Sequence, residues 1–245
     1  MTKTAAKQAT PAAKPTRRLF LLLFIAFSLG NLISVALDSA TGNLVTKPFL
    51  MLWLGLYAFW RFGRPLTRPD RLILSGLGFS LVGDILLLFQ GRDTLFFLGG
   101  LASFLCAHFC YILAFAGKMT GPGAVQKRPW LALPLLAYGG IMLVWLWPDL
   151  PAAFQAPVAL YTLVITIMGI AALNRLGAMP STAFRLLFGG ALFFILSDST
   201  LAVAKFMGDT VILPQAGLII MITYLLGQWG IVEGWGKDER EAFIR

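Results

Sequence analysis

The sequence predicts an all-α polytopic membrane protein with eight transmembrane helices and both termini in the cytoplasm. Three observations lead to this fold class. Hydrophobic residues make up 58% of the 245 residues and charged residues only 13%, whereas a soluble domain carries about 25% charged residues. Long stretches of the chain contain no charge, and the Lys and Arg residues gather between alternate stretches. A soluble fold of this size would have too few charges to cover so much apolar surface.

Five stretches without Asp, Glu, Lys or Arg are each long enough to cross about 30 Å of hydrocarbon at about 1.5 Å per residue. They are residues 19–37, 94–117, 129–148, 150–174 and 210–232. Two further runs, 72–91 and 186–204, would qualify except that each contains one aspartate. A shorter run, 48–60, lies between Lys47 and Arg61, whose long side chains can reach the membrane surfaces. Together these runs predict eight spans.

The two ends of the chain differ in composition from the middle. Residues 1–18 are polar, small and basic, which is typical of a disordered tail. Residues 19–235 contain all the apolar runs and are expected to form one transmembrane domain. Residues 236–245 are charged and are expected to form a cytoplasmic C-terminal tail.

The distribution of positive charge predicts the orientation, because cytoplasmic loops of membrane proteins are rich in Lys and Arg. Of the 20 Lys and Arg residues, 17 fall on the side of the two termini, and only Lys47, Arg92 and Lys205 fall on the other side. Both termini are therefore expected in the cytoplasm, and in a bacterium the protein would lie in the inner (cell) membrane. The net charge of +9 follows from this topology, so no nucleic-acid partner is expected.

Asp84 and Asp198 are the only acidic residues deep within the predicted spans. A charged residue at the centre of a span costs about 2.5–3.5 kcal/mol, so an aspartate there indicates a functional site. Each is the thirteenth residue of its run, which places the two at a similar depth. The remaining aspartates, including Asp70, fall in loops or at span ends, where we expect them to be solvated.

Other polar residues fall at a comparable depth in other spans. His108 is the only histidine of the chain, and Tyr111, three residues later, lies on the same helix face. Tyr224 and Gln228 form a polar pair four residues apart, and Asn31 lies in the first span. Such residues also link helices through hydrogen bonds, so a structural role is equally open for Asn31, Gln228 and His108.

The two aspartates suggest acid–base chemistry. Two carboxyl groups in a site of low dielectric constant cannot both ionise cheaply, so one of them should keep its proton at neutral pH. An acid beside a carboxylate can act as a general acid and base. With a single histidine, the chain cannot form a three-histidine zinc site, and we predict neither a metal nor a cofactor. Cys106 and Cys110 are expected to be free thiols packed in the core.

Five short motifs come in a characteristic order. They are Thr46-Lys47-Pro48-Phe49-Leu50-Met51, Gly83-Asp84, Ala107-His108-x-x-Tyr111, Gly190-Ala191-Leu192-Phe193-Phe194-x-x-Ser197-Asp198 and Tyr224-x-x-x-Gln228. In these motifs the sequence resembles the YhhN-like lysoplasmalogenase family of multi-pass membrane proteins. The resemblance covers about residues 19–235.

This resemblance implies hydrolysis of the vinyl ether bond of a lysoplasmalogen, a lysophospholipid of the bilayer. The products would be a fatty aldehyde and glycerophosphoethanolamine or glycerophosphocholine. A vinyl ether hydrolyses through protonation of its alkenyl carbon, so one of Asp84 and Asp198 would serve as the acid and the other as a carboxylate that stabilises the cation. The sequence leaves open which of the two is the acid. Lys47, at the outer membrane surface, would either meet the lipid phosphate or anchor the span. The residues that would orient substrate, water or the aspartates are His108, Tyr111, Tyr224, Gln228, Asn31 and Ser197.

Two other functions use buried carboxyl groups. An intramembrane aspartyl protease also has two membrane aspartates, one of them preceded by glycine as in Gly83-Asp84. The chain has Leu81 where the protease motif GxGD begins with glycine, and it lacks a Pro-Ala-Leu triplet. A proton-coupled transporter or lipid-binding protein would use the carboxyl groups as a relay. The oligomeric state is left open by the sequence.

Overall fold

The computed structural model describes residues 13–117, 119, 121–208 and 210–244, and in this part of the chain all regular structure is helical. The first half contains α1 (Ala13–Ala36), α2 (Ala40–Arg61), α3 (Arg68–Leu87) and α4 (Thr94–Ala116). The second half contains α5 (Ala124–Lys127), α6 (Leu133–Leu146) with 3₁₀ turns at Pro129–Ala132 and Trp147–Asp149, α7 (Ala152–Leu173), α8 (Ser181–Phe206) and α9 (Ala216–Ile244).

Six of these helical segments are long and apolar enough to cross a membrane, as judged by length and composition among the described residues. They are residues 15–36, 94–116, 129–149, 152–173, 181–206 and 216–238. The chain is thus an integral, multi-pass membrane protein. The helices α2 and α3, with 22 and 20 residues, are about as long as these six segments. They are not among the six because their charged residues lower their mean hydropathy.

The helix α2 begins at Ala40, eight residues before the run expected from sequence. Ser39 caps it, because its hydroxyl oxygen accepts a hydrogen bond from the backbone N–H of Gly42. Lys47 therefore lies inside the helix rather than at its end. The length of an uncharged run underestimates the length of a helix when the helix contains a charged residue with a buried partner. Here the charge of Lys47 is compensated by Asp84.

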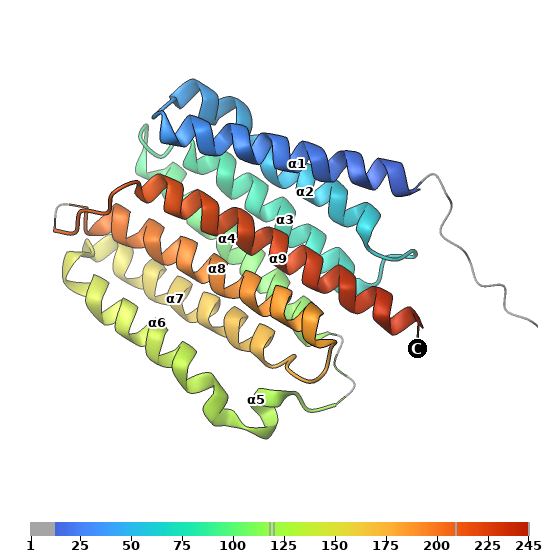
Figure 1. The fold of residues 1–245 in the computed structure, drawn as a ribbon. Helices are drawn as coiled ribbons and strands as arrows, with labels where there is room; N and C mark the ends of the chain where they lie inside the picture. Colours follow the sequence, from blue (N-terminus) through green and yellow to red (C-terminus); the bar gives the residue numbers. More distant parts are fainter. Residues whose placement is uncertain (1–12, 118, 120, 209, 245) are drawn as a thin grey trace, which may run out of the picture.

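The ends of the bundle also differ from expectation. The helix α1 begins at Ala13, so residues 13–18 of the expected tail are helical, while residues 1–12 lie outside the described residues. The helix α9 continues to Ile244, through the segment expected to be a tail. The start of α1 and the end of α9 lie at the same end of the bundle (Figure 1).

The helices run side by side along one direction, with α1 and α2 on one flank and α6 on the other (Figure 1). Consecutive helices pack as antiparallel pairs, most extensively α8 with α9, α3 with α4 and α1 with α2. The helix α7 packs against both α4 and α8, and α9 also contacts α1 and α2. This arrangement surrounds the middle of α8, which carries Asp198, with other helices.

Glycines allow α8 and α9 to approach closely. A Cβ atom on Gly190 would lie 2.6 Å from the backbone nitrogen of Ile231, and one on Gly234 would lie 2.4 Å from that of Leu187. Gly227 and Gly230 meet the α8 backbone in the same way. Small residues at such contacts are typical of helix packing in membranes.

The end of the bundle where α1 begins and α9 ends, which we call the basic end, contains buried charges. The expectation that Asp70, at this end, is solvated is wrong. Asp70 is fully buried, accepts a hydrogen bond of 2.7 Å from the indole Nε1 of Trp235, and caps α3 together with Thr67. Two ion pairs lie nearby in the fold, Arg61 with Glu233 at 3.3 Å and Arg175 with Asp238 at 3.0 Å. The position of a charged residue near the end of a span does not reveal these partners, because the partners come from α9, which is distant in the sequence.

Cys106 and Cys110 are free thiols, as expected, but they are not packed in the core. Cys106 is exposed and Cys110 is half-buried, whereas His108 and Tyr111 of the same helix are fully buried. The helix α4 therefore turns its cysteines outward and its histidine and tyrosine inward, as the helical spacing predicts.

Candidate functional site

Asp84 lies at the centre of the first polar cluster, which joins α2, α3 and α9. Its carboxylate Oδ2 accepts a hydrogen bond of 2.7 Å from the hydroxyl of Tyr224. Its Oδ1 lies 3.8 Å from the Nζ of Lys47. All three side chains point into the bundle, and Asp84 and Tyr224 are buried. The charge of Asp84 is thus compensated inside the bundle rather than by solvent.

Gln228 extends this cluster one turn further along α9. Its side-chain nitrogen donates a hydrogen bond of 2.9 Å to the hydroxyl oxygen of Ser80, and its oxygen accepts one of 2.7 Å from the hydroxyl of Tyr111. The ring of Tyr111 fits against α3 because residue 76 is glycine; a Cβ there would lie 2.3 Å from the ring. Tyr111, Tyr224 and Gln228 therefore meet in one network with Asp84.

Asp198 forms a second cluster with α4 and α7. Its Oδ2 accepts a hydrogen bond of 2.5 Å from the hydroxyl of Tyr161. The Nε2 of His108 lies 3.7 Å from the same oxygen. The imidazole is held edge-on to Tyr161 and also packs against the ring of Phe194, with ring centroids 5.3 Å and 4.8 Å apart. His108 is thus fixed in orientation beside Asp198.

Aromatic rings lie between the two clusters. Phe194 packs against His108 of the second cluster and against Tyr224 of the first, with 5.6 Å between the ring centroids of Phe194 and Tyr224. Phe104 packs edge-on against both Phe194 and Tyr224. The two aspartates therefore share a neighbourhood but have different hydrogen-bond partners.

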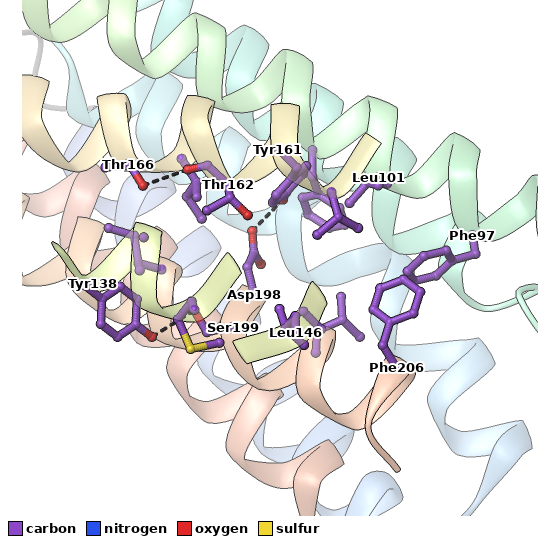
Figure 2. Close-up of a pocket in the computed structure, with 18 of the residues that line it drawn as sticks. Phe97, Leu101, Tyr138, Leu146, Tyr161, Thr162, Thr166, Asp198, Ser199 and Phe206 are labelled. Carbon is purple, nitrogen blue, oxygen red and sulfur yellow. Dashed lines mark hydrogen bonds between the residues drawn. The ribbon is translucent and has the colours of Figure 1, made fainter. Parts of the chain in front are cut away.

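A cavity of about 70 Å³ opens beside Asp198, among α3, α4, α6, α7 and α8 (Figure 2). Most of its lining is apolar, and its polar lining residues are Tyr138, Tyr161, Thr162, Thr166, Asp198 and Ser199. The hydroxyl of Tyr138 donates a hydrogen bond of 2.9 Å to that of Ser199. The volume suffices for water molecules, and the polar groups offer them partners. Asp84 is not among the described residues that line the cavity.

Three residues that the sequence places at the site have other contacts or another position in the structure. The side-chain nitrogen of Asn31 donates hydrogen bonds to Asn43 and Thr46, which joins α1 to α2. The hydroxyl of Ser197 donates to the backbone oxygen of Ile220, which joins α8 to α9. The expected surface position of Lys47 is wrong, since its side chain is only 13% exposed and faces Asp84. These are the contacts of residues that link helices.

Three residues that line the cavity were not predicted from sequence, namely Tyr138, Tyr161 and Ser199. The helices of Tyr138 and Tyr161 carry no acidic residue that would have marked them, and Ser199 was overlooked next to Asp198. Among the described residues there is no group of three His, Cys, Asp or Glu side chains placed to hold a metal ion.

The fold and the site define a class: a polytopic membrane protein with two aspartates inside the bundle, Asp84 buried and Asp198 partly buried at the wall of a cavity. Residues 42–235 match the YhhN family. The chain belongs to this family.

The relatives cover most of the chain. It is 34% identical over 185 residues to lysoplasmalogenase TMEM86A of Bos taurus, an alignment that covers 74% of this chain and 72% of the relative. The human lysoplasmalogenase TMEM86A is 35% identical with the same coverage. A lysoplasmalogenase of Mycobacterium bovis is 29% identical over 68% of this chain and 62% of its own length. No solved structure matches the chain.

Proposed function

We propose that the protein is a lysoplasmalogenase, an enzyme that hydrolyses the vinyl ether bond of lysoplasmalogens. The names of its relatives support this activity. The observation that carries the proposal is the position of Asp198, whose carboxyl group lies with the Tyr161 hydroxyl at the wall of a cavity large enough for water and has the His108 imidazole behind it. The apolar lining of the cavity, with a few convergent polar groups, has the chemical character of a site that contacts the polar end of a lipid.

Asp198 is the proposed general acid. Its carboxyl group transfers a proton to the alkenyl carbon that does not bear oxygen, and the electron pair of the C=C bond forms the new C–H bond. An oxocarbenium ion and the Asp198 carboxylate result, and the carboxylate stabilises the cation. Water adds to the carbon that bears oxygen and returns a proton to the carboxylate. The hemiacetal so formed breaks its C–O bond to give a fatty aldehyde and a free glycerol hydroxyl.

The charged partners support this division of roles between the two aspartates. Lys47 compensates the charge of an ionised Asp84, whereas among the described residues no Lys or Arg pairs with Asp198. Asp84 thus serves as the permanent carboxylate, which holds Tyr224 and Lys47 beside the site. Asp198 is the carboxyl group that gains and loses a proton, with Tyr161 and His108 as positioning residues.

The proposed activity is tested with the purified protein in detergent micelles. We expect a lysoplasmenyl phospholipid to release fatty aldehyde, and the acyl lysophospholipid of the same chain length and head group to remain intact, because an ester has no alkenyl carbon to protonate. Fatty acid release from the acyl lipid alone would contradict the proposal. Cleavage of a peptide, or lipid movement in vesicles without any bond cleavage, would favour the protease or the transporter instead.

We also propose that eight helices cross the membrane and that both termini face the cytoplasm, in the cell membrane if the source is bacterial. The helix α1 begins and α9 ends at the same end of the bundle (Figure 1), which supports an even number of crossings. The excess of Lys and Arg at that end supports its location on the cytoplasmic side of the membrane. Reporter fusions before α1, near Lys127 and after Arg245 are expected to report the cytoplasm. A fusion after Arg245 that reports the outer side would contradict the even count.

A further inference from the structure

A second hollow lies next to the cavity and is lined by α6, α7 and α8. Six of its lining residues are Leu131, Leu135, Leu173, Phe188, Leu192 and Leu196, and we call this hollow the α6–α8 groove. Tyr138 and Ile195 line both the groove and the cavity of Asp198. The two spaces therefore meet at these residues.

The α6–α8 groove has the dimensions and the chemistry of a hydrocarbon site. Apart from Tyr138 its lining side chains are apolar, and Leu192 and Leu196 are 39% and 45% exposed on the surface of the bundle. Ten residues of α8 separate Asp198 from Phe188, so the groove extends about 15 Å from the aspartate. That is about half of the ~30 Å thickness of the hydrocarbon layer.

A cation lies at the opposite end of the cavity. Lys205 follows Asp198 by seven residues, which places it on the same face of α8 about 10 Å further along the helix. Its Nζ lies 5.0 Å from the ring centroid of Phe97, and that ring lines the cavity. The Lys205 side chain is exposed, and among the described residues it has no ion pair. In Figure 2 Asp198 lies between Tyr138 on one side and Phe97 and Phe206 on the other.

From these three positions we infer how a lysophospholipid binds, an inference that rests on the proposed function. The lipid lies along α8 with its phosphate at Lys205, its ether bond at Asp198 and its single chain beyond Tyr138 in the α6–α8 groove. The distance from Asp198 to Lys205 leaves room for the glycerol backbone and the lysine side chain. One groove receives one chain, which matches a lipid with a single hydrocarbon chain.

The chain site is tested by binding, with an alkyl-ether lysophospholipid that has no vinyl ether bond to cleave. Leu192→Trp places a large ring in the groove and is expected to weaken binding of a long-chain analogue at least tenfold while changing that of a short-chain analogue little. The matched control is Ile141→Trp on α6, because Ile141 is 67% exposed and lines neither space. The control should bind both analogues like the parent.

The phosphate site is tested with the same analogue. Lys205→Gln is expected to raise its Kd about fivefold, as an exposed charge contact allows, and Lys205→Arg should restore binding. Arg92→Gln is the matched control, because Arg92 also stacks at 5.0 Å over a ring, that of Phe89, which does not line the cavity. The same Kd for Lys205→Gln and the parent would overturn the phosphate assignment.

The outcomes separate this inference from the proposed function. Equal losses for long and short chains in Leu192→Trp, or no loss at all, would overturn the groove as the chain site. A change in oligomeric mass in Leu192→Trp with unchanged lipid binding would instead make the groove an interface between copies of the chain, and would also overturn the inference. Because the analogue is not hydrolysed, these results hold whether or not the protein releases aldehyde from a lysoplasmalogen.

Discussion

Replacing Asp198 with Asn is expected to lower the rate of aldehyde release by about 10²–10⁴-fold, the usual contribution of a general acid. Asparagine fills the same space and can still accept the hydrogen bond from Tyr161, but it has no carboxylic proton to transfer. The protein should stay folded, because an amide in the membrane interior is less costly than a carboxylate. The measurement is kcat for a lysoplasmenyl phospholipid, with thermal unfolding of each variant in the same detergent.

Asp84→Asn is expected to remove activity as well, but with a different signature. It leaves the ammonium group of Lys47 without its partner inside the bundle, and an unpaired buried charge is strongly destabilising. Its unfolding temperature should therefore fall, unlike that of Asp198→Asn. Asp38→Asn, at an exposed turn, is the control for both. Near-normal aldehyde release from Asp198→Asn would remove this residue from the mechanism.

Gly190→Ala is expected to destabilise the bundle by about 1–3 kcal/mol, the usual cost of forcing extra atoms into a packed interior. The new Cβ would lie 2.6 Å from the backbone nitrogen of Ile231 and 2.7 Å from the backbone oxygen of Gly227. Neither backbone atom can move aside as a flexible side chain would. Separation of α8 from α9 would also move Asp198 relative to Tyr224, so activity should fall together with stability.

The adjacent glycine provides the control for this prediction. A Cβ on Gly189 would meet nothing within 4 Å, so Gly189→Ala should leave the protein unchanged or stabilise it by about 0.5–1 kcal/mol through helix propensity. Both variants are compared by thermal unfolding in detergent. Equal unfolding temperatures for the two variants would contradict the close backbone contact between α8 and α9.

The tyrosines show how much of the candidate site could be predicted from the sequence. The chain has 20 phenylalanines and only five tyrosines. Each tyrosine hydroxyl donates a hydrogen bond to a polar side chain: Tyr57 to Glu233, Tyr111 to Gln228, Tyr138 to Ser199, Tyr161 to Asp198 and Tyr224 to Asp84. In a chain with four times as many phenylalanines as tyrosines, a Tyr indicates a position where the hydroxyl is used. This rule would have indicated Tyr161 and Tyr138 as residues with polar partners, but not which partners they have.

Other features could not be predicted from one sequence. The helical fold and the exceptional positions of Asp84 and Asp198 follow from hydropathy, because charge is costly in hydrocarbon. The partners of those aspartates do not follow from it, because Lys47 and Tyr161 come from helices whose rotation and neighbours are set by packing. Asn31 illustrates the same limit, since its depth resembles that of the aspartates while its hydrogen bonds join α1 to α2.

The buried charges at the basic end of the bundle have a consequence for the order in which the protein is made. Arg61, the last residue of α2, and Arg175, in the turn after α7, are synthesised before α9, yet Glu233 and Asp238 come from the far part of α9 itself. Until that segment leaves the ribosome, the earlier helices lack these carboxylates, and Asp70 lacks the indole of Trp235. Assembly of this end of the bundle therefore waits for the last described helix. A chain that stops before Glu233 lacks both carboxylates and the indole of Trp235, so we expect this end of its bundle to stay less tightly packed.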